Sequence, residues 1–231
     1  MTRRRVAVLI SGRGSNMGAL VSAAGAADYP AEIALVLSNR PDAAGLVEAR
    51  NAGLATACVD HAAHPDRASF DAALDATLVT HGIEFVCLAG FMRVLTDAFV
   101  ERWAGRMINI HPSLLPLFRG TKTHRKALDA GVRIHGCTVH FVVPELDAGP
   151  IVSQAAVPVR PDDTEESLAS RVLAQEHRLY PAALRMICAG DARLERGRVT
   201  FRDAGTAKVA LMAPDETAPA GARTPSLGNE T

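Results

Sequence analysis

The sequence predicts an α/β fold built on a doubly wound, mostly parallel sheet. Short apolar runs alternate with longer alanine- and leucine-rich segments, and glycine-containing loops follow several of the runs. The chain has 231 residues, 48% of them hydrophobic, which is enough for one sizeable core. We therefore expect a single domain over residues 1–202.

The first half alternates expected strands and helices. The strands are continuous apolar runs, which is typical of strands buried on both faces. They cover residues 6–10, 33–37, 55–59, 85–89 and 107–110. The helices cover residues 17–27, 43–52, 70–80 and 97–103. In such sheets ligands bind beyond the carboxyl ends of the strands, which draws attention to residues 11–16, 90–95 and 109–120.

The second half has a different pattern. Segments 137–143 and 150–159 predict antiparallel strands in the C-terminal half of the sheet. Residues 164–189 predict one long helix with Thr164 as its N-cap, and Pro181 is expected to kink or break it. Beyond residue 202 the chain is rich in Ala, Pro, Gly and Thr without periodicity, so residues 203–231 are expected to form a flexible tail.

Composition argues against several classes of partner. The 25 basic residues balance 25 acidic ones, so no electrostatic case exists for nucleic acid or a membrane as partner. No segment is long enough to cross a bilayer, and the four cysteines form no C-x-x-C pair. We expect a cytoplasmic protein with buried, reduced thiols. His61 and His64 lack a third ligand, so no metal is expected.

A glycine loop, residues 11–16, joins the first expected strand to the first expected helix. Glycines permit tight turns, and the N–H groups at a helix N-terminus suit a phosphate. A monophosphate site is one interpretation. A dinucleotide site is another, because glycines at 12, 14 and 18 are followed by Arg40, which could hold the extra phosphate of NADP. A purely structural turn is the third.

Asn109, His111 and a distant Asp147 are the candidate catalytic residues. Asn109 and His111 are two residues apart at a strand end, so their side chains share one face. In an acyl transfer, Asn109 could donate a hydrogen bond to an oxyanion, and His111 could stabilise that charge or protonate the leaving nitrogen. Asp147 could hold His111 in its useful charge state. Sequence spacing does not decide whether Asp147 reaches His111, and a structural histidine with a turn aspartate is the alternative.

Several segments in this order resemble one enzyme family. They cover residues 10–16, 88–93, 109–116, 123–125, 135–141 and 145–150. The chain resembles the phosphoribosylglycinamide formyltransferases from about residue 5 to residue 200. Asn-x-His-Pro-Ser-Leu-Leu-Pro followed by Leu-Asp-x-Gly-Pro is specific for folate-dependent formyl transfer, and the Gly-Ser-Asn loop narrows the resemblance to this family. It implies a Rossmann-like formyltransferase fold.

The resemblance implies formyl transfer from 10-formyltetrahydrofolate, a cosubstrate, to the amine of glycinamide ribonucleotide in purine biosynthesis. It implies that Asn109, His111 and Asp147 are catalytic, with His111 as proton donor. The implied ribonucleotide contacts are Gly14, Ser15, Asn16, Leu173, Ala174, Gln175 and Glu176. The implied folate contacts are Arg67, Met92, Arg93, Val94, Leu95, Asn109, Val143, Pro144, Glu145, Leu146 and Asp147. A cis Leu115–Pro116 bond is also compatible with the resemblance.

The chain departs from the family in the loop of residues 117–122. Many family members carry proline before the glycine of this loop, where Arg119 stands here, and Lys122 makes the loop still more basic. The family treats this segment as a mobile flap, so loop closure or phosphate contacts are expected to differ. The sequence does not specify oligomeric state, and a homodimer is compatible with it.

Four other functions remain as alternatives. Methionyl-tRNA formyltransferase would need a basic tRNA-binding domain after residue 200, and formyltetrahydrofolate hydrolase an extra N-terminal module. An NADP-dependent oxidoreductase would use the glycine loop and Arg40. A binding module without catalysis would leave the candidate trio without a role.

Overall fold

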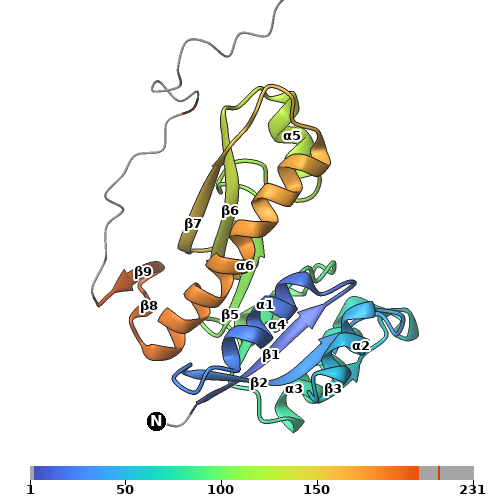
Figure 1. The fold of residues 1–231 in the computed structure, drawn as a ribbon. Helices are drawn as coiled ribbons and strands as arrows, with labels where there is room; N and C mark the ends of the chain where they lie inside the picture. Colours follow the sequence, from blue (N-terminus) through green and yellow to red (C-terminus); the bar gives the residue numbers. More distant parts are fainter. Residues whose placement is uncertain (1–2, 203–212, 214–231) are drawn as a thin grey trace, which may run out of the picture.

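The computed structural model describes residues 3–202 and Ala213; the rest of the predicted tail lies outside the described residues (Figure 1). The elements are β1 (Arg4–Ile10), α1 (Ser15–Ala24), β2 (Ala31–Ser38), α2 (Ala44–Asn51), β3 (Thr56–Cys58), η1 (His61–Ala63), α3 (Arg67–Thr80), β4 (Phe85–Leu88), α4 (Asp97–Arg102), β5 (Met107–His111), α5 (Thr123–Asp129), β6 (Ile134–Phe141), β7 (Ile151–Pro158), α6 (Glu165–Ala189), β8 (Ala192–Glu195) and β9 (Arg198–Phe201).

The main sheet has seven strands in the order β3-β2-β1-β4-β5-β6-β7. Strands β1 to β5 pair in parallel, whereas β6 is antiparallel to β5, and β7 is antiparallel to β6. This confirms the predicted mostly parallel sheet with antiparallel strands in the C-terminal half. The strand order reverses between β1 and β4, and the loops after these strands therefore meet at a topological switch point, where such sheets bind ligands.

Helices cover both faces of the sheet, as a doubly wound fold requires. Helices α1, α2 and α6 pack on one face through buried side chains such as Leu20, Leu46 and Leu184. Helices α3 and α4 pack on the other face, where Phe70 and Phe99 lie. Burying one such side chain contributes roughly 1.5–3 kcal/mol. The apolar core therefore holds the sheet in place, and the loops beyond it are left to carry polar chemistry.

Helix α6 continues through Pro181, where the sequence predicts a kink or a break, so the helix is not broken. The helix runs without interruption from Glu165 to Ala189, with Thr164 as its N-cap as predicted. A proline inside a helix costs about 3 kcal/mol or more. Here Pro181 is buried, and Tyr29 Oη donates a hydrogen bond to its carbonyl oxygen over 2.7 Å. Packing of a 25-residue helix against α1, β6 and β7 outweighs the local cost.

Two short parts of the fold have no counterpart among the segments expected from the sequence. Helix α5 has only seven residues and an αL N-cap, and β8 and β9 form a two-stranded antiparallel sheet of their own. These segments are short and mostly polar, so they lack the continuous apolar run that identifies a buried strand. The expectation of buried thiols is wrong for Cys58, which is exposed because β3 lies at the edge of the sheet.

Within the described residues, no helix has the length and apolar character needed to span a membrane.

Candidate active site

Strand β5 presents Asn109 and His111 from the same face, beside the antiparallel strand β6. The register places Asn109 opposite His140 and His111 opposite Thr138. His111 is buried, with 4% of its surface exposed. Asp147 reaches this pair from the loop between β6 and β7, where its Oδ2 lies 3.4 Å from His111 Nδ1. The structure thus brings together the three residues predicted to be catalytic.

The loop that carries Asp147 folds back tightly over β6. Asp147 itself has a φ of 50°, a left-handed conformation that Asp and Asn adopt more readily than most residues. A Cβ atom at Gly149 would collide with the carbonyl oxygen of Phe141, so only glycine permits this close approach. The main-chain N–H of Gly120 donates to Asp147 Oδ2 over 2.8 Å and fixes the direction of the carboxylate.

The other ring nitrogen of His111 faces the main chain. His111 Nε2 lies 3.0 Å from the carbonyl oxygen of Phe118. A carbonyl oxygen only accepts hydrogen bonds, so Nε2 carries a hydrogen and donates it. The nitrogen left facing Asp147 is Nδ1, and its 3.4 Å separation exceeds the 2.7–2.9 Å of a strong charge-assisted hydrogen bond. The contact between Nδ1 and Asp147 is therefore longer than a strong hydrogen bond.

His140 orients Asn109. His140 Nδ1 donates to the carbonyl of Phe141 over 2.9 Å, which leaves Nε2 as an acceptor for Asn109 Nδ2 at 3.3 Å. Burial lowers the pKa of His140, so the ring is neutral and can accept this bond. The second hydrogen on Asn109 Nδ2 remains for a ligand. His140 thus lies in contact with a candidate catalytic residue.

The turn after His111 rests on β6 and β7. Thr138 Oγ1 donates to the carbonyl of Ser113 over 2.7 Å and accepts from the N–H of Leu115 over 3.0 Å. Gln154 Nε2 donates to the carbonyl of Leu115 over 3.0 Å. The Leu115–Pro116 peptide bond is cis, which confirms that expectation. These contacts attach the turn between His111 and the loop of residues 117–122 to β6 and β7.

The glycine loop leads into α1 at the switch point of the sheet. Gly14 has a φ of 79° and is the N-cap residue of α1, where no side chain caps the helix. Ser15 begins the helix, so its first N–H groups face outward for an anion. The N–H of Ser11 donates to the carbonyl of Gly90 over 3.2 Å, and the N–H of Met92 to Ser11 Oγ over 2.7 Å. The loops after β1 and β4 therefore lie in contact.

Helix α6 meets this loop through Glu176. Asn16 Nδ2 donates to Glu176 Oε2 over 2.7 Å, and Glu176 is buried. Burial raises the pKa of Glu176, against the smaller opposing effect of the Asn16 hydrogen bond. Sequence alone could not separate Glu176 from an ordinary polar helix position. The other residues of α6 predicted to contact the ribonucleotide are less buried than Glu176. Ala174 is exposed, and Leu173 and Gln175 are half-buried.

The predicted folate residues come from three separate places. Arg67 begins α3, Met92 to Leu95 follow β4, and Val143 to Asp147 lie between β6 and β7. Three large apolar side chains stand out, since Met92 is 70% exposed, Val94 59% and Leu146 56%. Apolar side chains that together form an exposed patch are typical of a surface that binds a ligand. Leu95 differs from them, because it is buried in the core.

The basic loop of residues 117–122 makes contacts within the protein. Arg119 Nη1 lies 2.6 Å from Glu145 Oε1, and Lys126 Nζ donates to the carbonyl of Arg119 over 2.8 Å. Arg119 is thus paired with a residue of the predicted folate segment. Arg40, the other candidate phosphate ligand, forms a two-point contact with Asp42 at 3.1 and 2.8 Å. Both side chains of this pair are exposed, so the ion pair is a weak one.

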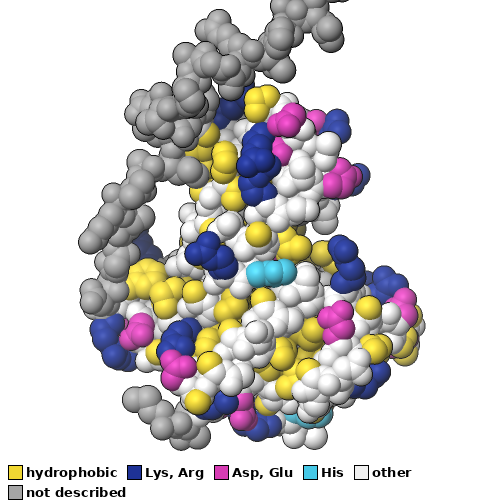
Figure 2. Space-filling model, in the orientation of Figure 1, with side chains coloured by type: hydrophobic (Ala, Val, Ile, Leu, Met, Phe, Trp, Pro, Cys, Tyr) yellow, Lys and Arg dark blue, Asp and Glu magenta, His cyan; other side chains and the backbone are white. Residues whose placement is uncertain are grey.

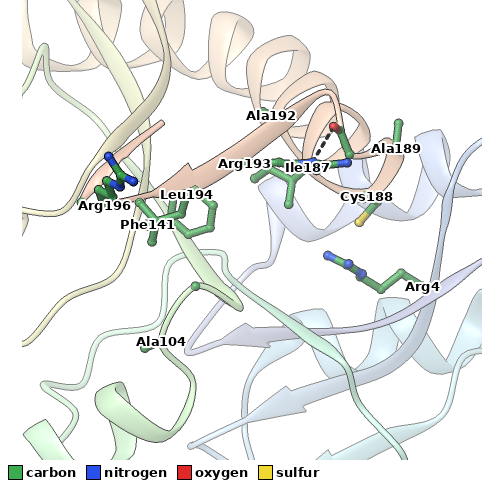
Figure 3. A pocket seen from close by; sticks show the side chains of 13 residues that line it. Arg4, Ala104, Phe141, Ile187, Cys188, Ala189, Ala192, Arg193, Leu194 and Arg196 are labelled. Carbon is green, nitrogen blue, oxygen red and sulfur yellow. Dashed lines mark hydrogen bonds between the residues drawn. The ribbon is translucent and has the colours of Figure 1, made fainter. Parts of the chain in front are cut away.

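A separate cavity of about 730 Å³ lies at the opposite end of the sheet (Figure 3). Its walls come from the amino end of β1, the end of β6, the last turn of α6 and the β8–β9 hairpin, and they include Arg4, Phe141, Cys188, Arg193 and Arg196. Neither the candidate trio nor the glycine loop lines it. On the face drawn in Figure 2, basic and acidic side chains are interspersed. The candidate site is thus the place where the candidate trio meets, and this cavity is separate from it.

Comparisons with known proteins agree with this geometry. The family model described as Formyl transferase matches residues 4–184. Phosphoribosylglycinamide formyltransferase of Escherichia coli is 43% identical over 189 residues, which cover 82% of this chain and 89% of the relative. The trifunctional purine biosynthetic protein adenosine-3 of Bos taurus is 48% identical over 200 residues, which cover 86% of this chain. The chain spans only 20% of that relative's length.

Solved structures give the same result. Glycinamide ribonucleotide transformylase 1 from Symbiobacterium toebii is 46% identical, with a TM-score of 0.84 over 87% of this chain and 95% of that one. Phosphoribosylglycinamide formyltransferase from Brucella melitensis is 50% identical, with a TM-score of 0.78 over 82% and 97% of the two chains. From the family match and these likenesses, the chain belongs to the formyl transferase family and, within it, to the phosphoribosylglycinamide formyltransferases.

Proposed function

We propose that this protein transfers the formyl group of 10-formyltetrahydrofolate to the amine of glycinamide ribonucleotide, a step of purine biosynthesis. The single observation that carries the proposal is the convergence of Asn109, His111 and Asp147, with Asp147 Oδ2 at 3.4 Å from His111 Nδ1. An amide donor can stabilise the oxyanion of an acyl transfer to an amine, and an imidazole and a carboxylate can move its protons. The family to which the chain belongs supports the same reaction.

The proposed reaction begins when the amine nitrogen attacks the formyl carbon. A C–N bond forms, and the formyl oxygen becomes an oxyanion. The free hydrogen of Asn109 Nδ2 donates to this oxyanion, and the protonated Nδ1 of His111 stabilises the same charge. The amine loses one proton to Asp147, directly or through water. His111 then gives its Nδ1 proton to the leaving nitrogen of the folate as the carbon–nitrogen bond to the donor breaks.

Two regions are proposed to hold the substrates. The phosphate of the ribonucleotide binds the N-terminus of α1 at Gly14 to Asn16, where N–H groups and the helix dipole favour an anion. Glu176, together with residues 173–175 of α6, contacts the remainder of that substrate. The folate ring binds between residues 92–95 and 143–147, where exposed apolar side chains provide the contact area. Arg67 contacts the acidic part of the folate.

We further propose that residues 1–202 carry the whole activity and that the protein works in the cytoplasm on these two small molecules. No metal, nucleic acid or membrane takes part in the proposed reaction. The oligomeric state is not part of the mechanism, because Asn109, His111 and Asp147 all belong to one chain.

A spectrophotometric assay with 10-formyl-5,8-dideazafolate, a stable analogue of the donor, tests the proposal. The expected result is loss of the formyl group only when glycinamide ribonucleotide is present. Loss without the ribonucleotide would identify a hydrolase. No loss under either condition would overturn the proposal, and titration of NADPH fluorescence would then test the oxidoreductase alternative.

A further inference from the structure

Phe118 contacts the catalytic region through its backbone and packs into the core through its ring. Its carbonyl oxygen accepts from His111 Nε2 over 3.0 Å. Its ring lies edge-on against the ring of His135 on β6, with 5.9 Å between centroids and 66° between planes. Two residues later, the N–H of Gly120 donates to Asp147 Oδ2 over 2.8 Å. One short segment thus contacts both the imidazole and the carboxylate.

The Phe118 carbonyl determines which ring nitrogen of His111 can gain and release a proton. Because this carbonyl holds a hydrogen on Nε2, the neutral ring carries its lone pair on Nδ1. The nitrogen that gains and releases a proton is then Nδ1, which faces Asp147. The opposite tautomer would place a hydrogen on Nδ1 permanently and direct the lone pair of Nε2 at a carbonyl oxygen, which is repulsive. The tautomer therefore depends on where the Phe118 backbone lies.

The ring of Phe118 fixes that backbone position. Phe118 has a φ of 55°, an unfavourable conformation for a bulky residue that persists only where surrounding packing enforces it. The packing partner is His135, which is fully buried and lies 5.3 Å from the ring of His124. Burial lowers the pKa of His135 to about 4, so this partner is a neutral ring at physiological pH. Phe118 therefore combines a strained backbone with a ring that packing holds in place.

We propose that Phe118 is a positioning residue: its ring, anchored on His135, places its own carbonyl on His111 Nε2 and the Gly120 N–H on Asp147. The contact selects the tautomer in which His111 Nδ1 is the proton donor. This inference rests on the proposed formyl transfer. Phe118 acts through the catalytic residues and does not itself touch the reacting atoms.

The first test separates kcat from KM. In Phe118→Ala we expect kcat to fall about 10- to 100-fold, because small misplacements of catalytic groups have effects of this size. The KM for glycinamide ribonucleotide should stay within about twofold, since the glycine loop is unchanged. Phe118→Tyr should restore kcat to within about threefold of the unsubstituted protein. Leu117→Ala is the matched control, because that neighbouring side chain is 55% exposed, and its kcat should be unchanged.

The second test reads the tautomer directly. Nitrogen-15 NMR of histidine-labelled protein reports which ring nitrogen carries the hydrogen, and the signals that disappear in His111→Gln assign the residue. Above the pH at which the ring loses its charge, His111 should be the Nε2–H tautomer. Phe118→Ala should give a mixture of both tautomers, and Leu117→Ala should not.

The outcomes separate the two proposals. If the unsubstituted protein lacks ribonucleotide-dependent transfer, the proposed function fails. If it is active and Phe118→Ala retains full kcat, or keeps a pure Nε2–H tautomer, only the inference about Phe118 is overturned. Thermal unfolding monitors folding of each variant. Should Phe118→Ala fail to fold, Phe118→Leu keeps the volume but removes the edge-on ring contact, and the same kinetic and NMR outcomes decide.

Discussion

The two ends of the candidate site are built differently. The proposed ribonucleotide end is formed by regular elements, since α1 provides its N-terminus and α6 provides Glu176, which accepts a hydrogen bond from Asn16. The catalytic end depends on irregular loops, in which Asp147, Phe118 and Gly120 meet β5 through a few main-chain contacts. Regular elements are fixed by the core, whereas loops depend on individual contacts. We therefore expect substitutions at the catalytic end to change kcat and those at the ribonucleotide end to change KM.

The largest expected effect comes from Asp147→Asn. An amide can neither accept the amine proton nor balance a protonated His111, so kcat should fall about 10³-fold. Asn tolerates the φ of 50° at this position, so the fold should be retained. Steady-state kinetics and thermal unfolding measure the two properties. Near-normal turnover would remove Asp147 from the mechanism.

A somewhat smaller loss is expected for Asn109→Ala. Removing one donor to an oxyanion lowers kcat about 10²- to 10³-fold in comparable sites. Ser153→Ala on β7 is the matched control, because the described residues provide no hydrogen-bond partner for its buried hydroxyl. Kinetic assays of both variants should show the loss only at position 109. Equal kcat values for the two variants would contradict the role of Asn109 as oxyanion donor.

At the proposed ribonucleotide end, Glu176→Gln should raise the KM for the ribonucleotide about tenfold, because one charged hydrogen bond is lost, and kcat should change little.

The same change should stabilise the fold. Burial raises the pKa of Glu176 above its ordinary 4.5, so the charged carboxylate destabilises the folded state at higher pH. Denaturant unfolding should therefore find the variant more stable at pH 8, and the difference should vanish as the pH falls to about 4. A variant less stable at pH 8 would refute this.

The smallest effect is expected for Arg119→Ala. Its ion pair with Glu145 joins two exposed side chains, and such pairs contribute about 0–1 kcal/mol. We expect at most a fivefold change in the KM for the folate analogue, which should shrink further at 1 M salt because exposed charges are screened. Arg125→Ala, which breaks a comparable exposed pair with Asp129, is the control. A loss as large as that of Asn109→Ala would mean that Arg119 contacts a substrate.

Much of the fold could be predicted because its strands are apolar runs and its helices are long. The runs that became β1, β2, β4 and β5 were identified to within a few residues, since burial on both faces leaves only apolar side chains there. Helix α5 and the β8–β9 hairpin are not recognisable in the sequence, because α5 is mostly polar and neither β8 nor β9 is a continuous apolar run. Pro181 was expected to disturb α6, but packing of the whole helix outweighs one local conflict.

The sequence alone is enough to identify most of the candidate site. Alternation along a strand places Asn109 and His111 on one face, and the glycine loop follows another strand. The contacts between residues far apart in the sequence depend on the tertiary structure. The 3.4 Å approach of Asp147 to His111 joins residues 36 positions apart, and the Asn16–Glu176 hydrogen bond joins residues 160 positions apart. The hydrogen on His111 Nε2 is set by the Phe118 carbonyl. Every residue carries the same main-chain groups, so only the folded chain reveals which of them reach the site.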